Sequence, residues 1–282
     1  MNFKTKIIKI EGKNLEGFFQ NLVTNDIQLL KNNQVLYSAM LTPQGKFLVD
    51  FIILKEGDYF LIEANYKDIY EIRNLITKYD LRQDLKISFL KDINTHCIIY
   101  NDLPSDIKKD LVKFNTVKKN NSFILLDPRK NKYLARIWMN KKDIPSLPVK
   151  LTKGSSNKRL ELERIKNSIP DSLIDLEKEK SFILNFNFDK LNAISFKKGC
   201  YIGQENTSRQ NYRGKIKYLL NTVELIKGSF PKINTELFSE KQKVGVMKSY
   251  SEKYGLALLK VENIVKDKIL TIDEQSSKLK VI

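Results

Sequence analysis

Cysteine and histidine are scarce in this chain of 282 residues, which has two cysteines, Cys97 and Cys200, and one histidine, His96. Two cysteines cannot form a disulfide framework, which favours a reducing compartment. They also cannot bind zinc or an iron–sulfur cluster unaided, because such centres need four ligands. A Ser-His-Asp site would have to use His96, which lies in an apolar, strand-like run and is expected to be packed.

Long apolar runs are also missing. No window approaches the roughly 18 consecutive apolar residues that a membrane-spanning helix needs. Residues 1–10 lack the unbroken apolar stretch of a signal peptide. We therefore expect a soluble, intracellular protein of a bacterial cytoplasm, with the mitochondrial matrix as the alternative, and no membrane partner.

Acidic residues are outnumbered by basic ones, and the net charge is +17. Such a surface attracts polyanions, including nucleic acid. Only eight of the 50 basic residues are arginine, however, and nucleic-acid readers favour arginine. Lysine, asparagine and isoleucine are abundant along the whole chain, which indicates compositional drift. We therefore keep direct RNA binding as an alternative function and rank it last among the candidates.

The most informative segment is residues 197–205, Lys-Lys-Gly-Cys-Tyr-Ile-Gly-Gln-Glu. Cys200 follows two lysines and a glycine, and a helix-compatible run begins at Gly203. Cations and a helix N-terminus favour a thiolate, so we expect Cys200 to be exposed, ionised and reactive, at the rim of a positively charged cavity. The alternative is a small residue that fills a tight turn. Cys97, in an apolar run, is expected to be ordinary core packing.

Hydrophobic periodicity predicts a mixed fold. Strands are expected at residues 34–41, 46–54, 59–64, 86–90, 95–100, 123–126, 133–138, 217–225, 243–248, 254–261 and 269–272. Helices are expected at 15–22, at 66–79, and from Ser155 or Ser156 to before Pro170. Residues 140–153 resemble a connector. Short strands after Gly214 predict a closed or sandwich-like β-domain.

Residues 194–205, followed by Arg209 and Gly214, resemble the signature of the YgfZ family. These folate-binding-type proteins are related to the glycine-cleavage aminomethyltransferase (T-protein) and serve iron–sulfur cluster assembly. Residues 18–26 resemble the family's opening helix and its Thr-Asn-Asp end, and residues 41–46 resemble its hairpin.

The likeness extends to the element before the signature, where Arg164 and Pro170 match. Residues 187–192 and the pattern Glu205, Thr207 and Arg209 look closest to the branch that includes the mitochondrial iron–sulfur assembly factor.

The resemblance implies an α+β, T-protein-like arrangement of two interleaved α+β units and a C-terminal β-barrel around a central cavity. The first unit would comprise residues 1–50 and 150–213 and carry the cysteine motif. The second would comprise 51–149, and the barrel 214–282. The implied function is assembly or repair of [4Fe–4S] enzymes, including tRNA-modifying ones. The alternative is a tetrahydrofolate-dependent one-carbon transferase, so whether the protein is an enzyme stays open.

Candidate site residues follow from the motif and the resemblance. The catalytic candidates are Cys200, Lys198 and Arg209, and the cofactor-binding candidates are Asn25, Gln44, Arg164, Tyr201, Gln204 and Glu205. The cofactor implied by the fold family is tetrahydrofolate. Lys166, however, stands where the T-protein has a glutamate that contacts the pterin, and an ammonium cannot accept the hydrogen bonds of a pterin edge.

Cys200 has three possible roles: one ligand of a cluster shared with a partner, a redox-active thiol, or a covalent nucleophile. A shared ligand fits best, because one chain offers one such sulfur and a partner must supply the rest. The expected partners are an A-type iron–sulfur carrier or client iron–sulfur enzymes, which Lys197 and Lys198 would attract if acidic. Glu205 and Arg209 also have purely structural alternatives. Glu205 could be a helix-start residue, and Arg209, four residues later, could form an ion pair with it on one helix face.

Overall fold

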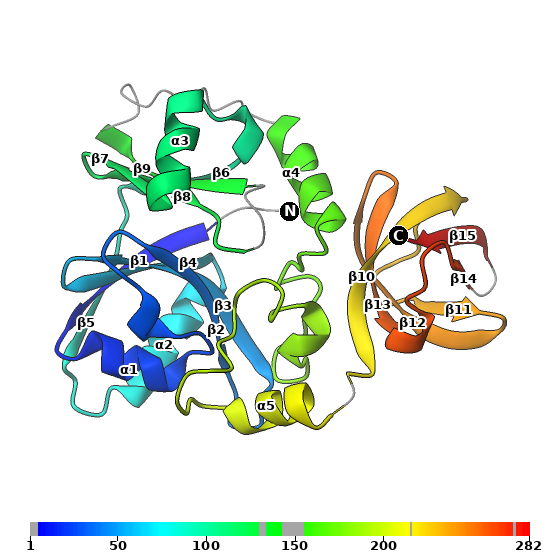
Figure 1. Ribbon diagram of the computed structural model, residues 1–282, viewed down its shortest axis with the longest axis horizontal. Coiled ribbons are helices and arrows are strands. Elements are labelled where there is room, and N and C mark those ends of the chain that lie inside the picture. The colour runs from blue at the N-terminus through cyan, green and yellow to red at the C-terminus, as the bar shows by residue number, and fades with distance from the viewer. Residues whose placement is uncertain (1–4, 130–133, 143–154, 215, 273–274) are drawn as a thin grey trace.

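Three β-sheets organise the computed structural model, which describes residues 5–129, 134–142, 155–214, 216–272 and 275–282 (Figure 1). The first sheet is antiparallel and has the strand order β2-β3-β4-β1-β5. Its strands are β1 (Thr5–Gly12), β2 (Val35–Leu41), β3 (Phe47–Glu56), β4 (Tyr59–Asn65) and β5 (Leu85–Phe89). Strand β1 was not expected from the sequence.

Alternation along β3 shows how both faces of the first sheet are used. Val49, Phe51 and Ile53 pack in a core with the helices α1 (Leu15–Leu22) and α2 (Asp68–Tyr79). Ile52 and Leu54 point to the opposite face and join a second, central core. Successive side chains of a strand point to opposite faces, so a strand buried on both sides is apolar almost throughout.

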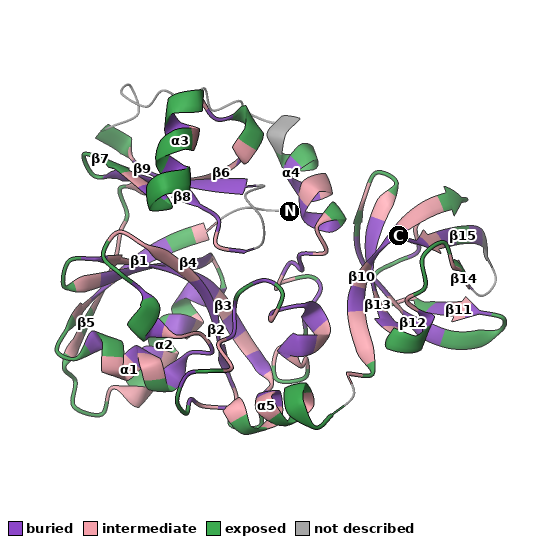
Figure 2. Cartoon of the chain, viewed as in Figure 1, coloured by how far each residue is buried: buried purple, intermediate pink, exposed green. Residues whose placement is uncertain are grey.

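The second sheet has the order β6-β9-β8-β7. Its strands are β6 (Ile93–Ile99), β7 (Thr116–Lys119), β8 (Ser122–Leu126) and β9 (Leu134–Asn140). Helix α3 (Ser105–Phe114), which was not expected from the sequence, buries Ile107 and Leu111 against it. Most residues of α3 face solvent, whereas β8 and most of β3 are buried (Figure 2).

The third sheet is a closed antiparallel barrel with its own core, as predicted for the C-terminal part. Its order is β10-β13-β12-β11-β14-β15, with β10 (Tyr218–Lys227), β11 (Glu236–Ser239), β12 (Gln242–Ser251), β13 (Tyr254–Lys260), β14 (Ile269–Ile272) and β15 (Gln275–Val281). Helix α4 (Ser155–Lys166) packs against β6 and the barrel strands β12 and β13.

The central core joins all three sheets. It combines Leu54 of the first sheet, Trp138 of the second and Leu256 of the barrel. The irregular segment between α4 and α5 (Gln204–Tyr212) fills the space between the three sheets. Its buried residues include Phe186, in the short 3₁₀ helix η4 (Ile183–Phe186), and Phe188, which follows that helix. This segment therefore positions the cysteine motif that follows it.

The expected boundary between the first two α+β units cuts through the first sheet. The boundary at residue 50 falls inside β3, and backbone pairing joins residues from β1 to β5 in one sheet. The boundary at 149/150 and most of the connector at 140–153 lie outside the described residues. A division between β5 and β6 would leave both sheets whole.

Candidate functional site

The cysteine motif lies on an irregular segment that ends where α5 begins, beside the β2–β3 hairpin (Figure 1). The Cys200 side chain is exposed, as predicted, and Gly199 before it has open space around its Cα. Cys200 does not line any of these three cavities, so its place at the rim of a cavity stays a prediction. Its sulfur is presented on the outer surface.

Lys198 is turned inward, away from the exposed face that carries Cys200. It is buried, and its Nζ donates to the carbonyl oxygens of Gln20, Val23 and Asn25 at 2.7, 2.6 and 2.8 Å. These carbonyls lie at or just after the C-terminal end of α1, where a cation offsets unsatisfied acceptors. Burial lowers the pKa of Lys198 to about 8. The geometry makes Lys198 an anchor of the motif segment.

A glycine contact joins the motif to the hairpin predicted at residues 41–46. Gly203 has φ +82°, and a Cβ there would lie 2.5 Å from the carbonyl oxygen of Thr42. A Cβ on Gly45, with φ +75°, would meet the carbonyl oxygen of Gly203 at 2.9 Å. Both positions therefore need glycine, for backbone conformation and for close approach. Asn206 Nδ2 adds a 2.7 Å hydrogen bond to the carbonyl of Gln44.

The predicted Thr-Asn-Asp end of the first helix also contacts the segment before the motif. Thr24 donates from Oγ1 to the Ala193 carbonyl at 2.6 Å, and the backbone N–H of Ser195 donates to the Thr24 carbonyl at 3.1 Å. Both amide hydrogens of Asn25 are used, at 2.9 Å to the Tyr37 carbonyl and 2.6 Å to the Asn192 carbonyl. Asn25 therefore holds two chain segments together and has no donor left for a cofactor.

The remaining motif candidates divide between interior and surface. Tyr201 is buried, burial raises its pKa to about 12, and its ring lies 5.0 Å from Lys198 Nζ. Gln204 starts α5, and Glu205 and Arg209 are both exposed. No ion pair joins Glu205 to Arg209 among the described residues. The structural alternative of an ion pair between them is therefore not formed, and both side chains face solvent.

Arg164 lies apart from the motif, in a buried network between α4 and the barrel. All five of its N–H groups are used: two bind Glu161, two bind Asp175 and the Ile169 carbonyl, and one binds Ser249 Oγ at 2.6 Å. No donor remains for a cofactor. Lys166 is exposed, and its Nζ lies 5.3 Å from the centre of the Tyr254 ring.

A small central cavity lies between the first two sheets and residues 170–172. Its volume is about 60 Å³, whereas sites for drug-sized ligands measure about 300–1,000 Å³. Lys166 does not line it. This cavity is therefore too small to enclose tetrahydrofolate.

Paired charges, which the sequence analysis missed, close this cavity. Glu63 accepts from Arg136 at 2.8 Å and from the Trp138 indole at 2.7 Å, and Arg136 also donates to Asp127 at 3.0 Å. Burial alone would raise the pKa of Asp127, but Arg129 and Arg136 hold it well below its usual value. A single charged residue inside an otherwise apolar strand, as in Leu-Ile-Glu-Ala, was the signal for this cluster.

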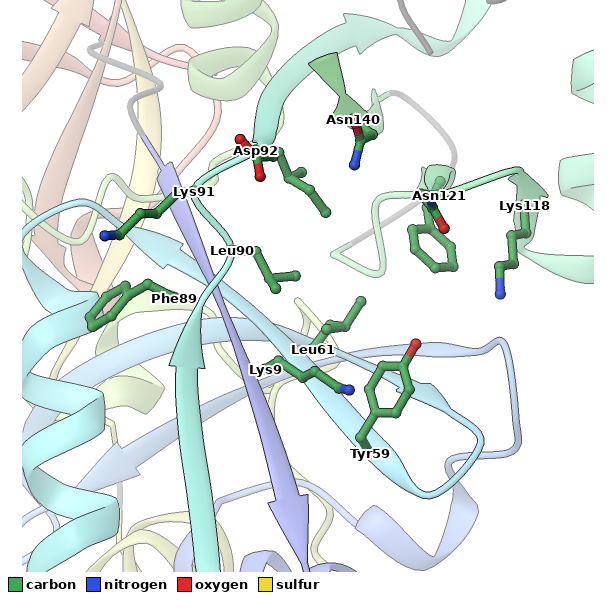
Figure 3. A pocket seen from close by; sticks show the side chains of 12 residues that line it. Lys9, Tyr59, Leu61, Phe89, Leu90, Lys91, Asp92, Lys118, Asn121 and Asn140 are labelled. Carbon is green, nitrogen blue, oxygen red and sulfur yellow. The ribbon is translucent and has the colours of Figure 1, made fainter. Parts of the chain in front are cut away.

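A larger cavity of about 430 Å³ lies between the first two sheets on another side (Figure 3). The Lys9 amine points toward the Tyr59 ring, 4.0 Å from its centre, and Leu61 lies beside it in the lining. Lys9 is paired with Glu11, and Lys118 with Glu56. No residue of the cysteine motif lines this cavity, so it is not part of the candidate site.

Comparisons with known proteins agree with the motif. Residues 220–282 match the family model of the CAF17 C-terminal beta-barrel domain. The chain is 28% identical over 240 residues to the iron-sulfur cluster assembly factor IBA57 homolog of Neurospora crassa, covering 81% of this chain and 54% of that protein. It is 25% identical over 250 residues to the tRNA-modifying protein YgfZ of Buchnera aphidicola, covering 84% and 76%.

The resemblance to the YgfZ family is confirmed. The chain spans about half the length of the first curated relatives that it matches. The proteins similar to this chain include both mitochondrial proteins, such as that of Mus musculus, and the bacterial protein of Buchnera aphidicola. In the described part of the chain, no helix is long and apolar enough to span a membrane.

A solved structure confirms the predicted fold. The aminomethyltransferase T of the glycine cleavage system from Bartonella henselae superposes with a TM-score of 0.76 and covers 98% of this chain and 82% of its own. At 14% sequence identity this likeness concerns the fold alone. The T-protein-like arrangement with a C-terminal barrel is therefore present here.

Proposed function

We propose that this chain is an iron–sulfur cluster assembly or repair factor that serves [4Fe–4S] proteins through Cys200. One observation carries the proposal: an exposed thiol stands on a segment whose neighbours are firmly held. Lys198 anchors the segment to the carbonyl groups at the end of α1, and Gly203 packs closely against the β2–β3 hairpin. The names of the similar proteins support the same function.

The cluster is the cargo in this proposal, and Cys200 supplies one thiolate ligand. Soft thiolates suit iron–sulfur clusters, which are held mostly by four cysteines. The other cysteine, Cys97, lies in β6 of the second sheet, and no cluster of three or more potential metal ligands occurs among the described residues. A partner would supply the remaining ligands. The partner classes are an A-type carrier or a client enzyme.

The test is complementation in a strain that lacks its own factor, with aconitase activity as the readout. Cys200→Ser should abolish the rescue, whereas the matched variant Cys97→Ser should keep it. Both proteins should be present at equal levels, measured by immunoblot. Full rescue by Cys200→Ser would contradict the proposal. Comparing rescue in bacterial cells with rescue in mitochondria would also distinguish a bacterial cytoplasm from a mitochondrial matrix.

A tetrahydrofolate-dependent transferase is the second candidate, because the fold is that of an aminomethyltransferase. The small central cavity and the exposed position of Lys166 oppose it. Trp138 donates to Glu63, which lines the cavity, so its fluorescence reports ligand entry. We expect no change on titration with tetrahydrofolate. A saturable change would favour this second function.

A further inference from the structure

An apolar groove lies where α5 meets the barrel, and neither the motif nor the relatives' names assign it a role. Its volume is about 830 Å³. Ile216, Leu219 and Val261 supply apolar surface, and Val261 is 45% exposed. The last turn of α5 contributes Gln210 and Asn211. Exposed apolar surface of this kind marks interaction sites in soluble proteins.

The surroundings of the groove are basic. Lys190, Lys217 and Lys260 line it, against the carboxylates Asp189 and Glu262. Exposed arginines, Arg209 and Arg213, continue the positive charge along α5. Charge complementarity therefore favours an acidic partner.

An exposed aromatic side chain lies in the last turn of α5, close in sequence to the groove residues Gln210 and Asn211. Tyr212 of α5 is 68% exposed, and its ring meets that of Phe196 edge to face, with 6.1 Å between the centroids. Exposed tyrosines on a fixed backbone are frequent anchors of protein interfaces. Asp189, on the groove wall, also has one buried carboxylate oxygen, Oδ1, without a hydrogen-bond partner among the described residues.

We propose that this groove and the exposed side of α5 dock an acidic segment of the cluster-bearing partner, with an apolar side chain seated at Val261. The inference rests on the proposed function. Helix α5 spans nine residues, or about 13 Å at 1.5 Å per residue. A standard interface covers about 800 Å² per partner, enough to contact both ends of such a helix. A partner held in the groove thus reaches Cys200 at the other end.

The experiment measures anaerobic binding of a purified [2Fe–2S] A-type carrier by calorimetry. Val261→Glu places a carboxylate in the groove, and Val265→Glu is its matched control, because Val265 is 55% exposed and does not line the groove. We expect the dissociation constant to rise at least tenfold for Val261→Glu and less than twofold for Val265→Glu. Lys217→Glu should weaken binding more than Lys232→Glu, and added salt should weaken binding by the wild type.

The outcomes separate the two proposals. Cys200→Ala should bind the carrier like the wild type but form no shared cluster absorbance. Equal affinities of Val261→Glu and Val265→Glu would overturn the docking site alone, and the function would still stand on loss of rescue by Cys200→Ser. Absence of any binding by the wild-type chain would overturn the docking proposal, and rescue by Cys200→Ser would overturn the function.

Discussion

The two cysteines stand in opposite surroundings. Cys97 lies in β6 opposite Arg136 of β9, beside the closed cluster of paired charges, and burial raises its pKa to about 11. Cys200 lies on a segment whose lysine is buried and whose sulfur is exposed. In the first region polar groups satisfy one another, and in the second they hold the backbone and leave the thiol exposed. This is the difference in surroundings expected between a structural and a reactive cysteine.

The largest effect should come from opening the closed region. Arg136→Met leaves Glu63 and Asp127 without their shared cation and should cost about 3–5 kcal/mol of unfolding free energy. Arg159→Met breaks an exposed pair with Asp102 and should cost less than about 1 kcal/mol. Chemical denaturation measures both. Equal losses would show that the buried cluster is no more important than a surface pair.

Thiol alkylation tests the comparison directly. With a pKa of about 11, Cys97 is about one part in a thousand thiolate at pH 8. We expect iodoacetamide to modify Cys200 at least roughly 100-fold faster than Cys97 in the folded protein. Mass spectrometry of timed samples gives both rates, and in denaturant they should converge. Similar rates in the native state would remove the distinction between the two regions.

The fit of Gly203 against the hairpin can be separated from its backbone conformation. Gly57 also has positive φ, +55°, but a Cβ there meets nothing within 4 Å. Gly57→Ala should therefore cost about 1 kcal/mol, and Gly203→Ala roughly 2 kcal/mol or more, because its Cβ also collides with Thr42. Thermal and urea unfolding give the values. A smaller loss for Gly203→Ala would mean that the hairpin yields easily.

The smallest effect concerns the pH dependence of the Lys198 anchor. Its pKa of about 8 lies below the ordinary 10.5, so between these values the unfolded chain binds a proton that the folded chain lacks. Stability contributed by this group therefore rises with pH in that window. The unfolding free energy of the wild type relative to Lys198→Met should increase by on the order of 1 kcal/mol from pH 8 to 10. A constant difference would show that the ammonium persists, held by its three carbonyls.

Much of the fold followed from local patterns. Alternation predicted most strands of the first sheet and of the barrel, and the turn at residues 42–45 was evident from proline and glycine. Strand β1 and helix α3 were missed, because a short run rich in lysine gives a weak signal whichever structure it adopts. The interior roles of Asn25 and Arg164 were not predictable either, since their partners Asn192 and Ser249 are remote in sequence.

The amino-acid sequence by itself determined that Cys200 stands in a basic, polar setting unlike that of Cys97, and that a β-domain ends the chain. Tertiary structure alone decided that Lys198 is turned inward to three carbonyls of another segment, that Glu63 meets Arg136, and that a groove opens beside α5. The physical reason is range. Periodicity and turn chemistry act within a few residues, whereas the direction of a charged side chain depends on which distant acceptors the packed chain leaves unsatisfied.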